Sequence, residues 1–166
     1  NGVRKRLLGD KGTKVDVKIK RGKDVANLDF TIERDKIPIY SVDASYMAKP
    51  KVGYIKLNNF SASSVDEIKK AVYKLKADGM KDLILDLQNN GGGYLMTAVE
   101  LVDQFLSEPK LVVSTKGRAF PERKFQTRFN GILEDGRLVV LVNESSASAS
   151  EIVSGAIQDL SLIHIS

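Results

Sequence analysis

The chain has no cysteine and only one histidine, His164, among its 166 residues. The lack of cysteine excludes disulfide bonds, thiolate catalysis and zinc–thiolate sites, and it agrees with either a cytosolic or an envelope location. A Ser-His-Asp triad would depend entirely on His164, the third residue from the end. Any other nucleophilic mechanism needs a different base, and a desolvated lysine can serve as one.

Long apolar runs and nucleotide-binding motifs are also missing. No window reaches the ~18 uninterrupted apolar residues of a membrane-spanning helix. The chain has no initiator methionine and no signal-peptide pattern, so we expect any targeting segment to have been removed from it. Neither G-x-x-x-x-G-K-[ST] nor G-x-G-x-x-G occurs, and we expect no cofactor and no metal.

The composition is that of an ordinary globular protein, with 42% hydrophobic and 28% charged residues. The net charge of +5 is uneven, since residues 1–51 carry 13 Lys and Arg against 7 Asp and Glu. Such a basic segment could indicate a nucleic-acid partner. Because Lys14, Lys18 and Lys20 alternate with apolar residues, we interpret them as one solvated strand face and expect no nucleic-acid binding.

Residues 1–34 read as a short helix followed by two strands, 13–21 and 26–34, with period-2 alternation. These elements are too few for a core of their own, so they resemble the back half of a small β-rich domain. Pro38 and Pro50 favour extended backbone before them, and we expect residues 35–51 to be a linker.

The remaining chain alternates strands and helices, which predicts an α/β core with a mainly parallel sheet over 52–159. Ser64 and Glu67 have the spacing of a capping box at the start of a helix, whose apolar face repeats every three or four residues. The other expected elements are strands at 52–57, 82–87, 110–115 and 137–142, and helices at 94–106 and 150–160.

Two unusual turns follow predicted strands, and ligands gather at the carboxyl ends of strands in such sheets. In QNNGGG (88–93), the glycines leave backbone N–H groups free to bind an anion or an oxyanion; the alternative is a simple flexible turn. In ESSASAS (144–150), alanines flank Ser148, and the amide of Ala149 would lie at a helix N-terminus. The alternative is that Ser146, Ser148 or Ser150 is only a helix N-cap.

The segments VGYIKLNNFS, LILDLQNNGGGYLMTAVELVDQFL and VVLVNESSASASEIVSGAIQD resemble, in that order, the C-terminal processing peptidases, S41-type serine peptidases also called tail-specific proteases. The resemblance implies a crotonase/Clp-like α/β core preceded by a PDZ domain, of which residues 1–34 would be the C-terminal half. It makes Ser148 the nucleophile of a Ser/Lys dyad and leaves Ser146 and Ser150 structural. The oxyanion donors would be the amides of Ala149 and of Gly93 or Gly92, with Asp159 as a supporting residue.

The chain departs from this family in three places. Gln88 stands where the family usually has arginine, which would alter local hydrogen bonding. Ser145 replaces a usual glycine, in a turn for which a positive φ is then expected. After Asp159 the sequence LSLIHIS resembles a translated sequencing adaptor, so we expect residues 160–166 to be a non-native tail and His164 to be an artefact. The family's catalytic lysine follows the serine by roughly two dozen residues, so we expect it to lie outside the chain.

The resemblance implies an endopeptidase of the periplasm or cell envelope that cleaves near the C-termini of polypeptides with exposed tails. It also allows a peripheral membrane association. It leaves open the oligomeric state and whether the source compartment is a bacterial envelope or a chloroplast lumen. We expect the 166-residue chain itself to be inactive. The alternatives are a catalytically dead homologue that binds peptides or lipids, and a crotonase-type acyl-CoA enzyme, which would have no use for SASASE.

Overall fold

The computed structural model describes residues 2–22, 27–35, 40–128 and 131–160. The chain divides into two compact units, Asn1–Ile39 and Tyr40–Ser166, and each is described by itself. Residues 161–166, which include His164 and most of the expected non-native tail, lie outside the described residues.

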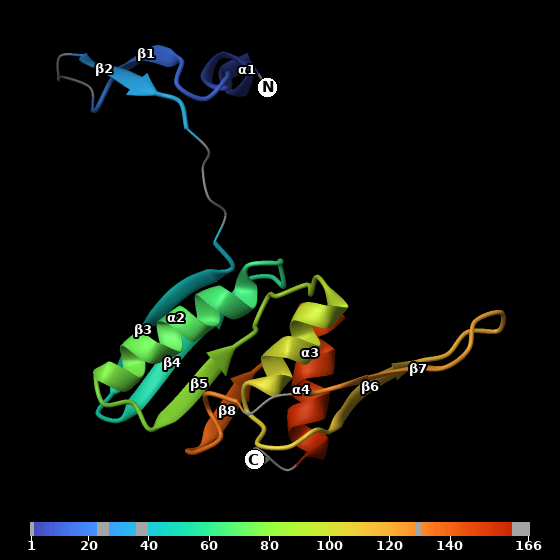
Figure 1. The fold of residues 1–166 in the computed structure, drawn as a ribbon. Helices are drawn as coiled ribbons and strands as arrows, with labels where there is room; N and C mark the ends of the chain where they lie inside the picture. Colours follow the sequence, from blue (N-terminus) through green and yellow to red (C-terminus); the bar gives the residue numbers. More distant parts are fainter. Residues whose placement is uncertain (1, 23–26, 36–39, 129–130, 161–166) are drawn as a thin grey trace. The chain divides into compact units, whose positions relative to one another are not determined.

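The first unit contains one helix and one hairpin. Helix α1 (Gly2–Leu7) precedes strands β1 (Lys14–Ile19) and β2 (Leu28–Glu33), which pair antiparallel from Lys14↔Glu33 to Ile19↔Leu28 (Figure 1). Arg34 ties the helix to the hairpin, because its guanidinium donates to Leu7 O at 2.8 Å and to Lys14 O at 3.0 Å. These elements match the predicted ones, and their origin in a PDZ domain stays a prediction.

The second unit is built on a four-stranded mixed sheet of order β3-β4-β5-β8. Its strands are β3 (Val42–Lys49), β4 (Val52–Leu57), β5 (Asp82–Asp86) and β8 (Leu138–Leu141). Strands β4, β5 and β8 run parallel, whereas β3 is antiparallel to β4. The expectation of a mainly parallel sheet is thus replaced by a mixed one.

Strand β3 lies within the stretch that the sequence predicts as a linker, 35–51, so that prediction is wrong for residues 42–49. Its side chains do not alternate cleanly between apolar and polar types, and its stability comes from pairing with β4 and from Glu67. The Glu67 carboxylate accepts the N–H groups of Ser41 at 2.7 Å and Val42 at 2.9 Å. Glu67 therefore anchors the start of β3.

The capping box predicted between Ser64 and Glu67 is not the one that forms. Helix α2 (Ser64–Ala77) has Ser63, not Ser64, as its N-cap, and the Ser63 hydroxyl donates to Glu67 Oε1 at 2.7 Å. The Ser64 hydroxyl instead accepts the N–H of Ser61 at 2.7 Å. The helix begins where the sequence predicts, but different side chains fix its first turn.

One continuous hydrophobic core joins the sheet to the helices. The predicted apolar face of α2 is confirmed, since Ile68, Val72 and Leu75 are at most 1% exposed. Helix α2 lies across β3 and β4, and α3 (Leu95–Asp103) packs beside α4 (Ala149–Asp159) (Figure 1). Burying these apolar side chains is the main stabilising term of the unit.

A separate two-stranded sheet extends from this unit. Strands β6 (Leu111–Thr115) and β7 (Arg123–Gln126) pair antiparallel, and β6 contacts α3 and α4 near its base. The sequence predicts β6 but not β7, whose residues Arg-Lys-Phe-Gln are mostly polar.

Candidate functional site

The two unusual turns meet at the carboxyl edge of the sheet. Strands β5 and β8 are parallel neighbours, so the QNNGGG turn after β5 and the ESSASAS turn after β8 leave the same edge side by side. Gly92 lies directly against the serine turn: a Cβ placed on it would be 2.8 Å from both Ala147 O and Ser148 Cβ. With φ of +100°, this position requires glycine for its backbone conformation as well as for space.

Asn90 holds the two turns together from inside the protein. Its fully buried amide group donates to Leu57 O at 2.9 Å and accepts the Gly92 N–H at 2.9 Å. Its backbone carbonyl accepts the Ala147 N–H at 3.1 Å and the Ser150 hydroxyl at 2.9 Å. A single residue thus bonds to both turns and to strand β4.

The serines of the second turn divide into structural and exposed ones. The Ser146 hydroxyl donates to Leu87 O at 2.8 Å, and the Ser150 hydroxyl is buried against Asn90 O. Ser148 is exposed at the N-terminus of α4. It is indeed an N-cap, as the alternative holds, and it forms a capping box with Glu151, whose carboxylate accepts the Ser148 N–H at 2.6 Å.

The backbone of Ser148 distinguishes it from an ordinary N-cap. An ordinary N-cap residue has β-region angles, whereas Ser148 has φ 56° and ψ −111°, a conformation otherwise typical of glycine. Such a residue costs roughly 1–3 kcal/mol of strain, and strained residues of this kind cluster at active sites. The positive φ expected at Ser145 is found at Ser148 instead.

Two backbone N–H groups of the two turns, those of Gly93 and Ala149, have no hydrogen-bond acceptor among the described residues. The Gly92 N–H is already engaged by Asn90, which separates it from the other two predicted donors. Gly93 is fixed in place by Phe60, because the neighbouring N–H of Tyr94 donates to Phe60 O at 2.9 Å and a Cβ on Gly93 would be 2.1 Å from that oxygen.

Asp159 lies far from this arrangement. Ser148 caps the N-terminus of α4 and Asp159 is the last residue of the same helix, so the helical rise separates them by roughly 16 Å. Asp159 is exposed there. A direct supporting role of Asp159 at Ser148 therefore has no geometric basis in this structure.

A polar cluster of Tyr54, Lys56 and Asp86, which the sequence analysis did not predict, holds the start of the glycine turn. Asp86 is 5% exposed, and its carboxylate accepts Tyr54 OH at 2.5 Å, the Gln88 N–H at 2.8 Å and Lys56 Nζ at 3.1 Å. Lys56 Nζ also donates to Gln88 O at 2.5 Å. Lys56 and Asp86 thus fix both backbone groups of Gln88, the first residue of the QNNGGG segment.

Burial and hydrogen bonding shift the pKa values in this cluster. Burial, the hydrogen bond to Asp86 and its negative charge raise the pKa of Tyr54 to about 12. Burial alone would raise the pKa of Asp86, but the hydrogen bonds from Tyr54, Gln88 and Lys56 together with the ammonium charge lower it below its usual value. Both shifts favour a neutral Tyr54 beside an ionised Asp86.

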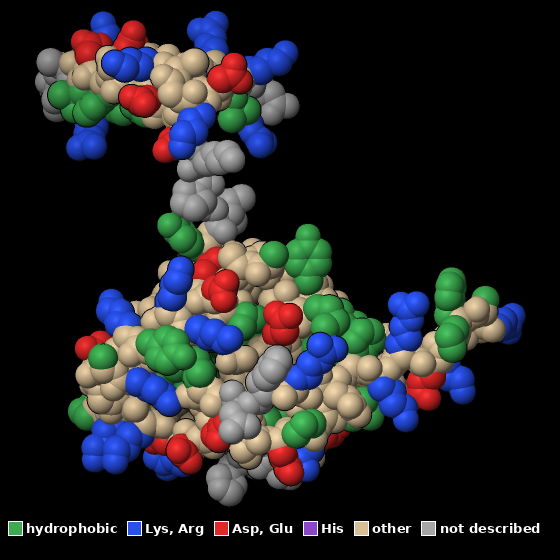
Figure 2. All heavy atoms as spheres, viewed as in Figure 1, with side chains coloured by type: hydrophobic (Ala, Val, Ile, Leu, Met, Phe, Trp, Pro, Cys, Tyr) green, Lys and Arg blue, Asp and Glu red, His purple; other side chains and the backbone are tan. Residues whose placement is uncertain are grey.

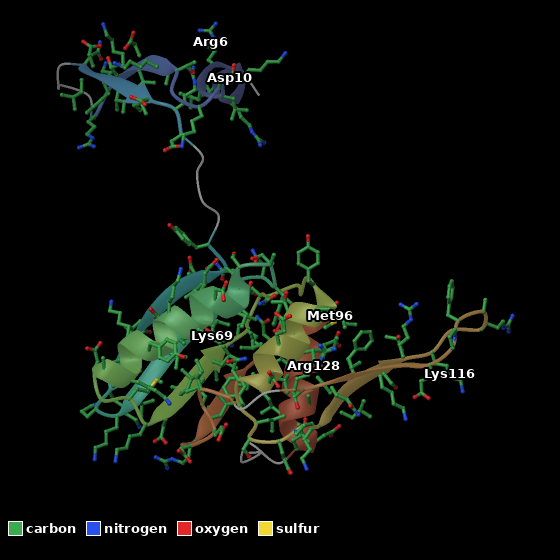
Figure 3. All side chains as sticks on the ribbon, viewed as in Figure 1. Arg6, Asp10, Lys69, Met96, Lys116 and Arg128 are labelled. Carbon is green, nitrogen blue, oxygen red and sulfur yellow. The ribbon has the colours of Figure 1, made fainter. Side chains whose placement is uncertain are left out.

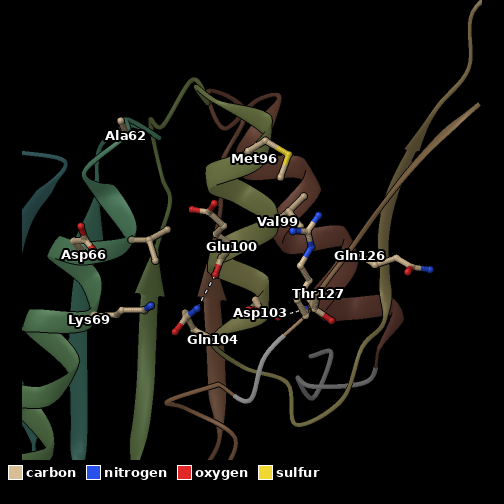
Figure 4. Close-up of a pocket in the computed structure, with 12 residues that line it drawn as sticks. Ala62, Asp66, Lys69, Met96, Val99, Glu100, Asp103, Gln104, Gln126 and Thr127 are labelled. Carbon is tan, nitrogen blue, oxygen red and sulfur yellow. Dashed lines mark hydrogen bonds between the residues drawn. The ribbon is translucent and has the colours of Figure 1, made fainter. Parts of the chain in front are cut away.

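A groove of about 290 Å³ lies between α2 and α3 (Figure 4). Val65, Met96 and Val99 supply apolar surface, while Lys69 and Glu100 face the groove from opposite helices. Arg128, labelled in Figure 3, also lines the groove. Ser148 does not line this groove, so it is separate from the site at the two turns.

No group of three or more acidic or histidine side chains in the described ranges is arranged to hold a metal ion. The two turns themselves bring together a serine hydroxyl and main-chain dipoles. An exposed serine at a helix N-terminus, with unengaged N–H groups in the two adjoining turns, suits acyl transfer through an oxyanion.

Comparisons with known proteins show the family to which the chain is similar. Residues 51–165 match the family model of Peptidase family S41. The chain is 40% identical over 160 residues to a probable CtpA-like serine protease of Staphylococcus aureus (strain N315), covering 95% of the chain and 31% of the relative. A Staphylococcus epidermidis (strain ATCC 35984) protein of the same description is 39% identical over 158 residues, again covering 95% and 31%.

Solved structures show the same similarity. The photosystem II D1 C-terminal processing protease superposes with a TM-score of 0.65 at 25% identity, covering 93% of this chain and 43% of that one. A putative S41 protease from Bacteroides fragilis shares the fold, with a TM-score of 0.64 at 18% identity, covering 95% and 48%. The chain thus spans about a third of the length of its curated relatives, and it belongs to peptidase family S41.

Proposed function

We propose that the protein containing this chain is a serine endopeptidase that cleaves polypeptides near their C-termini, with Ser148 as its nucleophile. The observation that carries the proposal is the strained, exposed Ser148 at a helix N-terminus, in contact with the glycine turn. Membership of family S41 and the similarity to CtpA-like serine proteases support it.

In the proposed reaction, Ser148 Oγ attacks the carbonyl carbon of the scissile peptide bond and loses its proton to a general base. The Gly93 and Ala149 N–H groups receive the oxyanion that forms, because they have no other acceptor among the described residues. Collapse of the intermediate expels the amine, which takes the proton from the base, and water then hydrolyses the acyl enzyme. Gly92 serves as a wall of the site rather than as a donor, since its N–H bonds to Asn90.

The general base is proposed to be a lysine outside this chain. Among the described residues, no lysine forms a hydrogen bond or ion pair with Ser148. In this proposal the first unit contributes to a PDZ domain that captures the substrate C-terminus by adding a strand to its sheet, and the enzyme works in the bacterial envelope. The 166-residue chain alone is then inactive.

The test uses a longer protein that continues beyond this chain and includes the expected lysine. We expect it to hydrolyse a fluorogenic peptide that has a free C-terminal carboxylate, and to prefer it over the amidated peptide. Ser148→Ala should abolish turnover. Ser145→Ala, an exposed serine of the same turn, should leave turnover unchanged and is the matched control.

Turnover that persists in Ser148→Ala would refute the assignment of the nucleophile. A longer protein that binds the peptide without hydrolysing it would instead favour the alternative, a catalytically dead homologue that acts as a binding module. Turnover by the isolated 166-residue chain, lost in Ser148→Ala, would show that its base lies within the chain.

A further inference from the structure

The hairpin formed by β6 and β7, with its connecting residues 116–122, projects away from the helices of the second unit (Figures 1 and 2). Thr127 fastens its base, since the Thr127 N–H donates to Lys110 O at 2.9 Å and the Lys110 N–H donates to Thr127 Oγ1 at 2.8 Å. The end away from this base, which we call the arm tip, comprises residues 115–124. Two-stranded sheets are marginal alone, so such an arm suggests a contact surface.

The arm tip is strongly basic. It carries four cations, Lys116, Arg118, Arg123 and Lys124, and one acid, Glu122. None of the four cations forms an ion pair with any described residue, whereas Lys110 at the base pairs with Glu108 at 2.6 Å. Figure 3 labels Lys116 on this arm. The charge of the tip is therefore not neutralised within the described chain.

The same tip exposes an aromatic ring. Phe120 is 73% exposed, among the highest values of any large apolar side chain in the described residues. The backbone there forms a closed turn, in which the N–H groups of Gly117 and Phe120 each donate to the other residue's carbonyl at 3.4 Å. A single exposed phenylalanine is common on protein surfaces, but here it stands among four cations that have no ion-pair partner in the described part of the chain.

We propose that the arm tip is a peripheral docking site for an anionic lipid surface. Phe120 enters the boundary between headgroups and acyl chains, while the cations pair with lipid phosphates. A soluble acidic polypeptide would need the cations but not the exposed ring, and a neutral bilayer would need the ring but not the cations. Both at one tip favour the anionic bilayer. This inference does not depend on the catalytic role of Ser148.

None of the helices in the described ranges has the length and apolar content that crossing a bilayer requires. The first unit is basic as well, with 11 Lys and Arg against 6 Asp and Glu in residues 1–39. A test must therefore locate the contact within the chain and not only detect binding.

The chain has no tryptophan, so a single substitution gives a local fluorescent reporter. We expect the emission of F120W in the 166-residue chain to shift to shorter wavelength on addition of phosphatidylcholine vesicles containing 30% phosphatidylglycerol. Lipids brominated on their acyl chains should quench it, and pure phosphatidylcholine should do neither. The matched control is Y73W, whose parent residue is 58% exposed on α2, and its emission should not change.

The cations are tested separately by vesicle co-sedimentation. Replacing Lys116 and Arg118 by glutamine should weaken binding to anionic vesicles about 25-fold, because each surface cation contributes roughly fivefold. Lys70→Gln with Lys74→Gln, two exposed lysines of α2, removes the same charge elsewhere and should weaken binding less than twofold.

Three results would overturn the proposal. The first is co-sedimentation of the chain with no change in F120W emission, which would place the contact elsewhere. The second is an equal loss of binding in the two double variants, which would make the attraction a property of net charge alone. The third is an F120W shift with soluble poly-glutamate as large as that with vesicles, which would identify an acidic polypeptide as the partner.

Discussion

Replacing Gly92 by alanine tests whether the two turns are in contact. The substitution combines two costs that the structure separates. The φ of +100° disfavours any residue with a Cβ by roughly 1–2 kcal/mol. The new methyl group would also lie 2.8 Å from Ala147 O and Ser148 Cβ, and overpacking of this kind costs roughly 1–3 kcal/mol.

We therefore expect Gly92→Ala to lower the free energy of unfolding by about 2–5 kcal/mol, the sum of the two terms. Two other glycines provide controls. Gly79 has φ of +90° but open space around its Cβ position, so Gly79→Ala should show the backbone term alone. Gly91 has neither a positive φ nor a neighbour within 4 Å, so Gly91→Ala should be close to neutral.

Urea unfolding followed by circular dichroism at 222 nm measures all three variants under the same conditions. The difference between Gly92→Ala and Gly79→Ala isolates the packing term. If the two variants are equally destabilised, the glycine turn does not press on Ser148. The proposal that the Gly93 and Ala149 N–H groups act on one oxyanion would then lose its support.

Three further predictions concern the serine turn and the polar cluster of Tyr54, Lys56 and Asp86. Ser148→Gly should be more stable to urea than Ser148→Ala by about 1–2 kcal/mol, because glycine relieves the positive φ and alanine keeps it; equal stabilities would show that Ser148 is unstrained. Tyr54→Phe should lower the free energy of unfolding by about 1.5–3 kcal/mol, the usual value of a hydrogen bond to a charged group, and a calorimetric scan at pH 7 that finds no loss would contradict the contact with Asp86. The folded-state pKa of Asp86 is lowered, so its contribution to stability is present above the unfolded pKa near 4 and disappears as pH falls through the folded value; Asp86→Asn should flatten that acid limb of the stability profile.

Much of the fold could be predicted from residue periodicity. The apolar face of α2 and the buried residues of β5 follow patterns that few alternatives satisfy. Strand β3 could not be predicted in this way, because its order comes from pairing with β4 and from the Glu67 carboxylate, which is 25 positions away from Val42. Strand propensity depends on such neighbours more than on the strand itself.

Some features of the candidate site could likewise be predicted from the sequence, and others could not. Small residues around Ser148 and the run of glycines indicate where close backbone approach is needed, so the chemistry could be anticipated. The role of Asn90 could not be anticipated, because the two adjacent asparagines look alike in the sequence. In the structure Asn90 is buried and bridges the two turns, whereas Asn89 has a φ of 62°. The Lys56–Asp86 pair left a usable signal, since period-2 spacing puts Tyr54 and Lys56 on one face of β4.

The geometry also explains why a strained serine can persist at this position. Glu151 holds the Ser148 N–H at 2.6 Å, and Asn90 fixes the residues on either side through the Ala147 N–H and the Ser150 hydroxyl. Each of these hydrogen bonds contributes roughly 0.5–3 kcal/mol, so together they can offset the roughly 1–3 kcal/mol of strain at one unfavourable residue. The Glu151 carboxylate and Asn90 hold the backbone of Ser148 and its neighbours, and the Ser148 side chain is exposed. A turn stabilised for its own sake would relax to β-region angles, so the fixed strain favours a role for the hydroxyl itself.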